Sequence, residues 1–187
     1  MDILPVKNRS EFRAWLALHH AEAAECWVAV KSGEPKAGAL YYLDAVEEAL
    51  CFGWIDSVKY KLDAEHHIMA QRFSPRKKNS PWSELNKERC RRLERLGLMT
   101  DAGRAVLPDM DAEFVVFDEI KNLIESDPVV KANFAGFPPL YQRIRLNSIQ
   151  RECSKPEIYE RMKRNFMEKT REGKMYGAWT DFGRLYP

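Results

Sequence analysis

The segment from residue 54 to residue 62, WIDSVKYKL, alternates in the way expected of a β-strand with two different faces. One face of the extended chain would carry Trp54, Asp56, Val58, Tyr60 and Leu62. The preceding residues 42–52 have apolar side chains at helical spacing, and Gly53 suits a left-handed helix stop. The sequence therefore predicts a helix that is followed at once by a half-buried strand.

The rest of the chain favours a mixture of helices and a few strands. Residues 26–31 are rich in β-branched and aromatic side chains, and residues 66–73 can return beside the first strand as a hairpin. The C-terminal part gives only helical patterns. We therefore predict an α+β fold, in which a small antiparallel sheet with flanking helices is followed by a helical C-terminal extension. The predicted domains are residues 1–107 and 108–187.

Length and charge limit the classes of protein open to this chain. Its 187 residues suit one domain or one domain with an appendage, and its formal net charge is +2. So small a charge does not favour non-specific binding of nucleic acid by the whole chain. No apolar run approaches the roughly 20 residues of a membrane-spanning helix, and the N-terminus lacks a signal-peptide pattern. We therefore expect a cytoplasmic protein without membrane association.

The sequence predicts neither a metal site nor a cofactor. The four cysteines lie far apart and form no C-x-x-C pair, so the spacing of metal ligands is absent. We expect free thiols that are mostly buried. No glycine-rich phosphate loop is present either, so nucleotide binding has no strong motif behind it.

Two charged residues are expected to lie on apolar faces. Asp56 shares its strand face with Trp54, and Arg89 falls within an apolar stripe of the next predicted helix. A buried carboxylate or guanidinium is costly alone, and a carboxylate is the planar partner that arginine prefers. We therefore predict an Asp56–Arg89 ion pair. The pair would either tie the helix to the sheet or offer one member to a ligand.

The loop of residues 72–82 is the second candidate site. Residues 72–95 carry nine Lys or Arg and three Glu, which predicts a basic surface. Aromatic and basic side chains together suit anionic ligands or single-stranded nucleic acid, although a solvated loop anchored by its aromatics is the alternative. The cations and rings concerned are Arg72, Phe73, Arg76, Lys77 and Trp82.

Glu47 and Glu48 are a third feature, on the predicted helix of residues 42–52. A carboxylate pair near the Asp56 strand could perform acid–base chemistry. The more ordinary interpretation is a solvated helix face.

Three spaced blocks carry a resemblance to a known family. The first is YLDAVEEALCFGWID from Tyr42 to Asp56, the second includes QRFSPR at residues 71–76, and the third is GLMT at residues 97–100. Together they resemble the YdeI/OmpD-associated proteins, also labelled bacteriocin-protection proteins, whereas the C-terminal helices resemble that family more loosely. The resemblance implies a bacterial, cytoplasmic protein of poorly defined biochemical role. It also suggests a connection with envelope stress or resistance to antimicrobial peptides, and it supplies no catalytic residues.

These features together favour a binding or regulatory protein over an enzyme. We expect it to hold an anionic small molecule or an acidic segment of a protein partner, and the sequence leaves a homodimer open. One alternative is a small-molecule enzyme that uses Asp56 or Glu47 as acid or base. Another is single-stranded nucleic-acid binding through residues 72–82. The predicted ligand-binding residues are Trp54, Asp56, Arg72, Phe73, Arg76, Lys77, Trp82 and Arg89.

Overall fold

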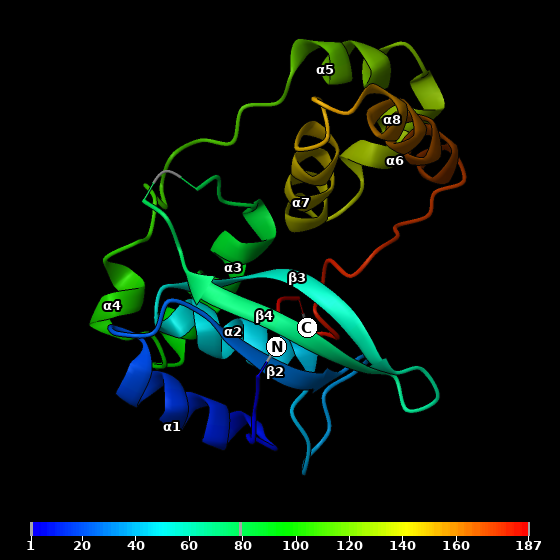
Figure 1. Ribbon diagram of the computed structural model, residues 1–187. Coiled ribbons are helices and arrows are strands. Elements are labelled where there is room, and N and C mark those ends of the chain that lie inside the picture. The colour runs from blue at the N-terminus through cyan, green and yellow to red at the C-terminus, as the bar shows by residue number, and fades with distance from the viewer. Residues whose placement is uncertain (1, 79, 187) are drawn as a thin grey trace. The chain divides into compact units, whose positions relative to one another are not determined.

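The computed structural model describes residues 2–78 and 80–186, which form two compact units (Figure 1). The first unit extends to Trp82 and resumes at Asn86–Met110, and the second comprises Ser83–Leu85 and the residues from Asp111 onward. The predicted α+β class with a helical C-terminal region is confirmed. The division after residue 107 stays a prediction about domains.

A four-stranded sheet and its helices make up the first unit. The sheet order is β1-β2-β4-β3, and β1 runs parallel to β2 whereas the other pairs are antiparallel. The sheet is therefore mixed, because a two-residue N-terminal strand adds to the predicted antiparallel part. The elements are β1 (Ile3–Leu4), α1 (Arg9–His19), β2 (Cys26–Lys31), α2 (Tyr42–Cys51), β3 (Trp54–Asp63), β4 (Ile68–Pro75), α3 (Glu84–Arg95) and α4 (Asp101–Arg104). The first two residues of α3 belong to the second unit.

Helices α1 and α2 cover one face of this sheet. Phe12 of α1, Leu50 of α2 and Phe73 of β4 belong to one buried apolar cluster. The Asn8 side chain caps α1 by accepting a hydrogen bond from the Glu11 backbone amide at 3.0 Å. Gly53 has φ of 75°, which confirms the predicted left-handed turn between α2 and β3.

The regular alternation of β3 breaks after Asp56. Asp56 pairs with Phe73 and Lys59 pairs with Gln71, so a step of three residues on β3 matches a step of two on β4. This is a β-bulge, and its extra residue moves the side chains that follow it to the opposite face, as far as a second register shift between Lys61 and Asp63. The strand was predicted correctly, but the predicted common face of its apolar residues is wrong beyond the bulge.

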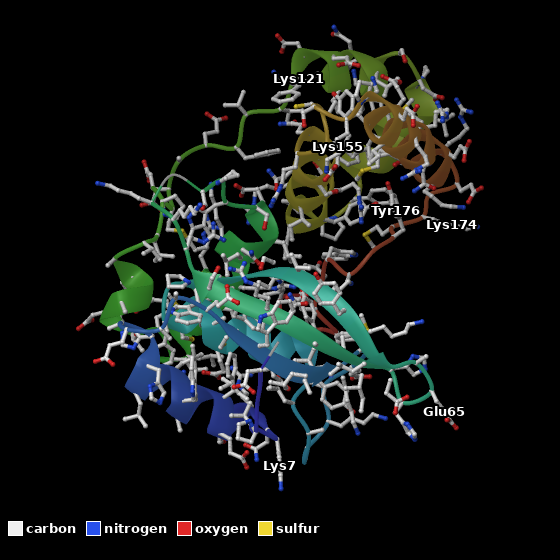
Figure 2. The ribbon with its side chains drawn as sticks, viewed as in Figure 1. Lys7, Glu65, Lys121, Lys155, Lys174 and Tyr176 are labelled. Atoms are coloured by element: carbon white, nitrogen blue, oxygen red, sulfur yellow. The ribbon has the colours of Figure 1, made fainter. Side chains whose placement is uncertain are left out.

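Tyr60 shows the effect of the bulge most clearly. Its ring lies on the face opposite Asp56 and stacks on Trp27 of β2, with ring centroids 5.5 Å apart. Residues 57–62 are all exposed, so this part of β3 is not the half-buried strand that was predicted. The turn of residues 64–67 that joins β3 to β4 carries Glu65, whose side chain points away from the sheet (Figure 2).

The second unit is helical and has a separate apolar core. Ile120, Tyr141 and Phe166 lie at its centre, and Trp179 of the aromatic tail packs edge-on against Tyr141 with centroids 5.4 Å apart. This tail therefore docks on its own unit. No helix in the described residues is both long and apolar enough to cross a membrane. The helices are α5 (Asp118–Glu125), α6 (Pro128–Ala135), α7 (Pro139–Gln150) and α8 (Pro156–Arg171).

Candidate functional site

Two of the aromatic residues predicted to contact a ligand belong to the core of the first unit. Trp54 is buried, and its indole Nε1 donates a hydrogen bond to the His20 carbonyl at 3.1 Å. Phe73 is also buried and lies against Phe12, with centroids 5.5 Å apart. Neither ring is available to a ligand, because both are enclosed by the packing of α1 on the sheet.

Asp56 has a different partner from the one predicted. The Tyr42 hydroxyl, at the start of α2, donates a hydrogen bond to the Asp56 carboxylate at 2.7 Å. Arg89 is buried on α3 and donates to the Asn86 side-chain oxygen at 2.8 Å. The predicted Asp56–Arg89 ion pair is therefore wrong. Strand alternation for Asp56 and helical phase for Arg89 identified the inward face of each element but not the side chain opposite to it.

The charge of Arg72 is balanced by Glu25, a neighbour that the sequence did not predict. Arg72 donates from Nε and Nη2 to one oxygen of Glu25, at 2.9 and 2.5 Å, and from Nη1 to Ser57 at 3.2 Å. This hydrogen bonding from Arg72 lowers the pKa of the Glu25 carboxyl. Glu25 immediately precedes β2, and only the register of β2 on β4 brings it beside Arg72.

The rest of the predicted basic loop is divided between enclosed and exposed residues. Arg76 is buried, its guanidinium carbon lies 3.7 Å from the Trp82 ring centroid, and Nη1 donates to the Pro81 carbonyl at 3.3 Å. Lys77 is exposed. Residue 79 of the loop lies outside the described residues. The loop thus presents less free positive charge and less aromatic surface than its sequence suggested.

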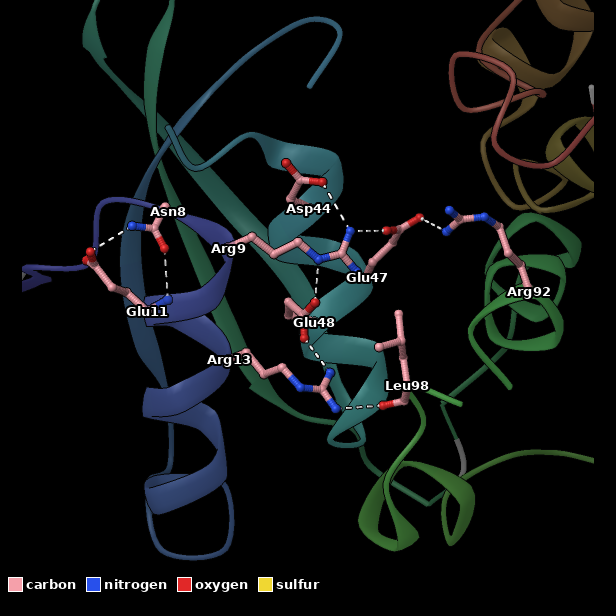
Figure 3. A network of polar contacts seen from close by, with 9 residues as sticks. All are labelled: Asn8, Arg9, Glu11, Arg13, Asp44, Glu47, Glu48, Arg92 and Leu98. Carbon is pink, nitrogen blue, oxygen red and sulfur yellow. Dashed lines mark hydrogen bonds and ion pairs between the residues drawn. The ribbon is translucent and has the colours of Figure 1, made fainter. Parts of the chain in front are cut away.

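The carboxylates of α2 form a buried network with arginines of the first unit (Figure 3). Glu47 has no exposed surface, and it accepts hydrogen bonds from Arg9 at 2.7 Å and from Arg92 at 2.9 Å. Glu48, which is 2% exposed, accepts from Arg9 at 2.5 Å and from Arg13 at 2.7 Å. The interpretation of a solvated face is wrong, because α2 is buried on every side.

This network resembles a structural clamp more than an acid–base site. Arg9 also donates to Asp44 at 3.3 Å, and Arg13 donates to the Leu98 carbonyl at 2.8 Å. Burial alone would lower the pKa of the Arg9 guanidinium, but Glu48 and Glu47 outweigh it and the pKa is raised. Carboxylates held by permanently charged guanidiniums are committed as acceptors, which leaves little chemistry for a general base.

The buried cysteines do not provide a nucleophile at neutral pH. Desolvation raises the pKa of Cys51 to about 11 and those of Cys26 and Cys90 to about 12. A thiol needs to ionise before it attacks. Within residues 2–78 and 80–186, no group of three or more His, Cys, Asp or Glu side chains is arranged to hold a metal ion.

Part of β3 is exposed to solvent in the first unit. β3 stands at the end of the sheet, and no described strand pairs with its outer edge. Val58, Tyr60 and Leu62 are 47%, 55% and 43% exposed. Lys59 and Lys61 alternate with them and are also exposed. We call residues 58–62 the β3 edge.

Gln71 holds the bulge at the start of the β3 edge. Its side-chain nitrogen donates to the carbonyls of Ser57 at 3.3 Å and Val58 at 3.2 Å, which lie within the bulge. The Gln71 side chain is buried, so these bonds satisfy its amide N–H donors, which water would not reach. The signal for the bulge in the sequence was this polar residue, Gln71, within the predicted strand of residues 66–73.

One protein family matches the segment that contains these features. Its sequence model, described as Domain of unknown function (DUF8412), matches residues 4–106, which is more than half of the chain. Neither curated proteins nor solved structures yield a match. The β3 edge and the buried network both lie inside the matched segment, and helices α5 to α8 lie outside it.

Proposed function

The chain belongs to this family of unknown function, and we propose that it is a binding module that pairs its β3 edge with an extended, acidic segment of a partner protein. The observation that carries the proposal is the exposed, unpaired strand edge. The backbone groups on such an edge are a template for one more strand.

The side chains of the β3 edge indicate which strand would suit it. Val58, Tyr60 and Leu62 provide apolar contact area, and Tyr60 is held in place by its stacking on Trp27. Lys59 and Lys61 make the edge positively charged. Like charges disfavour pairing with the same edge of a second copy, whereas an acidic segment would be attracted.

The predicted basic loop supports binding less well than the β3 edge does. Arg72 is engaged by Glu25, and Arg76 lies on Trp82, so few cations or rings are available for a small anion or for nucleic acid. The enzyme alternative is similarly weakened, since Glu47 is held by two arginines and Asp56 by Tyr42. The predicted relation to YdeI/OmpD-associated proteins, the link with stress resistance and the cytoplasmic location remain part of the proposal.

The direct test is a titration of ¹⁵N-labelled protein with a blocked seven-residue peptide of alternating valine and aspartate. We expect the amide signals of the β3 edge to shift. A peptide with alternate N-methylated residues should bind much more weakly, because it lacks the donors that a paired strand needs. Shifts confined to residues 72–82 would contradict the proposal.

Two matched charge reversals separate the candidate sites. The double variant Lys59→Glu/Lys61→Glu should weaken peptide binding by about tenfold, since two rim charges at roughly 0.5–1 kcal/mol each are inverted. The double variant Lys77→Glu/Lys78→Glu changes the net charge by the same amount, but on the basic loop. It should leave the peptide affinity within about twofold of that of the wild type. If the loop variant weakened peptide binding more than the β3-edge variant did, the binding site would be the loop of residues 72–82.

A further inference from the structure

The second unit contains a cavity of about 550 Å³ whose lining includes no residue of the β3 edge. Its apolar lining comes from Leu85, Ile144, Ile158 and Met162, and all of its lining residues belong to this one unit. Pockets of roughly 300–1,000 Å³ with a mostly apolar lining and a few polar groups are typical of small-molecule sites.

The polar groups at this cavity are mainly donors. Arg151 is exposed, and its guanidinium makes no hydrogen bond or ion pair with another described residue. Asn147 uses its side-chain oxygen to accept from the Glu84 amide at 3.0 Å, which leaves its two N–H donors for another group. The one carboxylate in the lining, Glu152, already pairs with Lys155 at 2.8 Å.

Helix α8 contributes its N-terminal end to the cavity, and its first turn also carries Glu157. Ile158 lies in the first turn of α8, and no side chain caps this end of the 16-residue helix. The N-terminal end of a helix carries partial positive charge. This open cavity thus combines apolar lining residues with the Arg151 guanidinium and the Asn147 donors.

We propose that this cavity binds a small amphipathic monocarboxylate, with its hydrocarbon part against Ile144, Ile158 and Met162 and its carboxylate against Arg151 and Asn147. The apolar lining disfavours a compact, fully hydrated anion, because burying such a charge without enough partners is costly. The lone unpaired guanidinium disfavours a neutral ligand. An aliphatic and an aromatic carboxylate share this chemistry.

Calorimetric titration of the full chain with octanoate and with 2-naphthoate tests the proposal. It also distinguishes an aliphatic ligand from an aromatic one. We expect at least one to bind, and Arg151→Gln to weaken that binding by about tenfold, as the loss of a charge-assisted hydrogen bond implies. Octanol should bind the wild type more weakly than octanoate does, and Arg151→Gln should not change octanol binding. The control Arg161→Gln alters an exposed arginine of α8 outside the cavity lining and should change nothing.

A second variant tests whether the carboxylate binds in this cavity or at an unrelated site. Ile158→Trp should fill the cavity and abolish binding, with far-UV circular dichroism showing that the helices persist. If neither carboxylate binds at millimolar concentration, or if both bind Arg151→Gln as tightly as wild type, the proposal is overturned. A Lys59→Glu/Lys61→Glu variant should bind octanoate normally, so this result is independent of the β3 edge.

Discussion

Replacing Glu47 with glutamine should lower the free energy of unfolding by about 3 kcal/mol, because a buried charge pair loses one partner. Glu47 has no exposed surface and accepts from both Arg9 and Arg92. Removing one member of a buried ion pair costs roughly 3–5 kcal/mol. We place the loss at the lower end, since the side chains of Arg9 and Arg92 are 30% and 21% exposed and can regain some hydration.

Urea denaturation followed by tryptophan fluorescence and circular dichroism measures this loss. The matched control is Glu94→Gln, which removes a carboxylate that pairs with Arg104 on the surface, with side chains 49% and 44% exposed. Exposed pairs contribute about 0–1 kcal/mol, so the control should remain close to wild type. If Glu47→Gln were as stable as Glu94→Gln, the network would not be the clamp described above.

Three further predictions concern packing, pH and thiol reactivity. Gly103→Ala should cost about 1–3 kcal/mol by thermal denaturation, because an added Cβ would lie 2.2 Å from the Cys51 carbonyl oxygen. In Asp127→Asn, the free energy of unfolding should fall less steeply with decreasing pH in the acid range than it does in the wild type. The hydrogen bond from Arg171 lowers the pKa of Asp127, so its contribution is present above the unfolded value of about 3.9 and is lost as pH falls through the folded value. In native protein, a thiol reagent should modify the exposed Cys153 first.

Each of these predictions has a result that would count against it. Gly136→Ala is a control for Gly103→Ala, since its added Cβ meets nothing closer than 3.5 Å, and equal losses would argue against the packing explanation. An acid limb of unchanged steepness in Asp127→Asn would show that the Arg171 contact contributes nothing. Rapid native labelling of Cys26, Cys51 or Cys90 would contradict their burial.

The fold class could be predicted from local patterns because those patterns report directly on backbone geometry. The helical spacing before Gly53 and the alternation after it correspond to α2 and the start of β3, and the φ of 75° at Gly53 matches its predicted role. The bulge after Asp56 could not be predicted, since one inserted residue leaves the composition of a strand unchanged. It nevertheless moved Tyr60 to the other face, where its ring stacks on Trp27.

The candidate site was harder to predict than the fold because charged partners meet through tertiary contacts. Glu25 reaches Arg72 only through the register of β2 on β4. Glu47 was expected to be solvated, since the sequence does not reveal that Arg9 and Arg92 approach it from other helices. The unpaired outer edge of β3 depends on strand order, which no local pattern specifies.

Amide hydrogen exchange of the β3 edge, with and without the alternating valine–aspartate peptide, shows whether this edge accepts another strand. Pairing with a new strand should slow exchange of alternate amides within residues 58–62 by at least about tenfold, because those N–H groups gain acceptors. The N-methylated peptide should give little protection. Saturating peptide that leaves these amides unprotected, or that protects residues 72–78 instead, would contradict the proposal that the β3 edge is the binding surface.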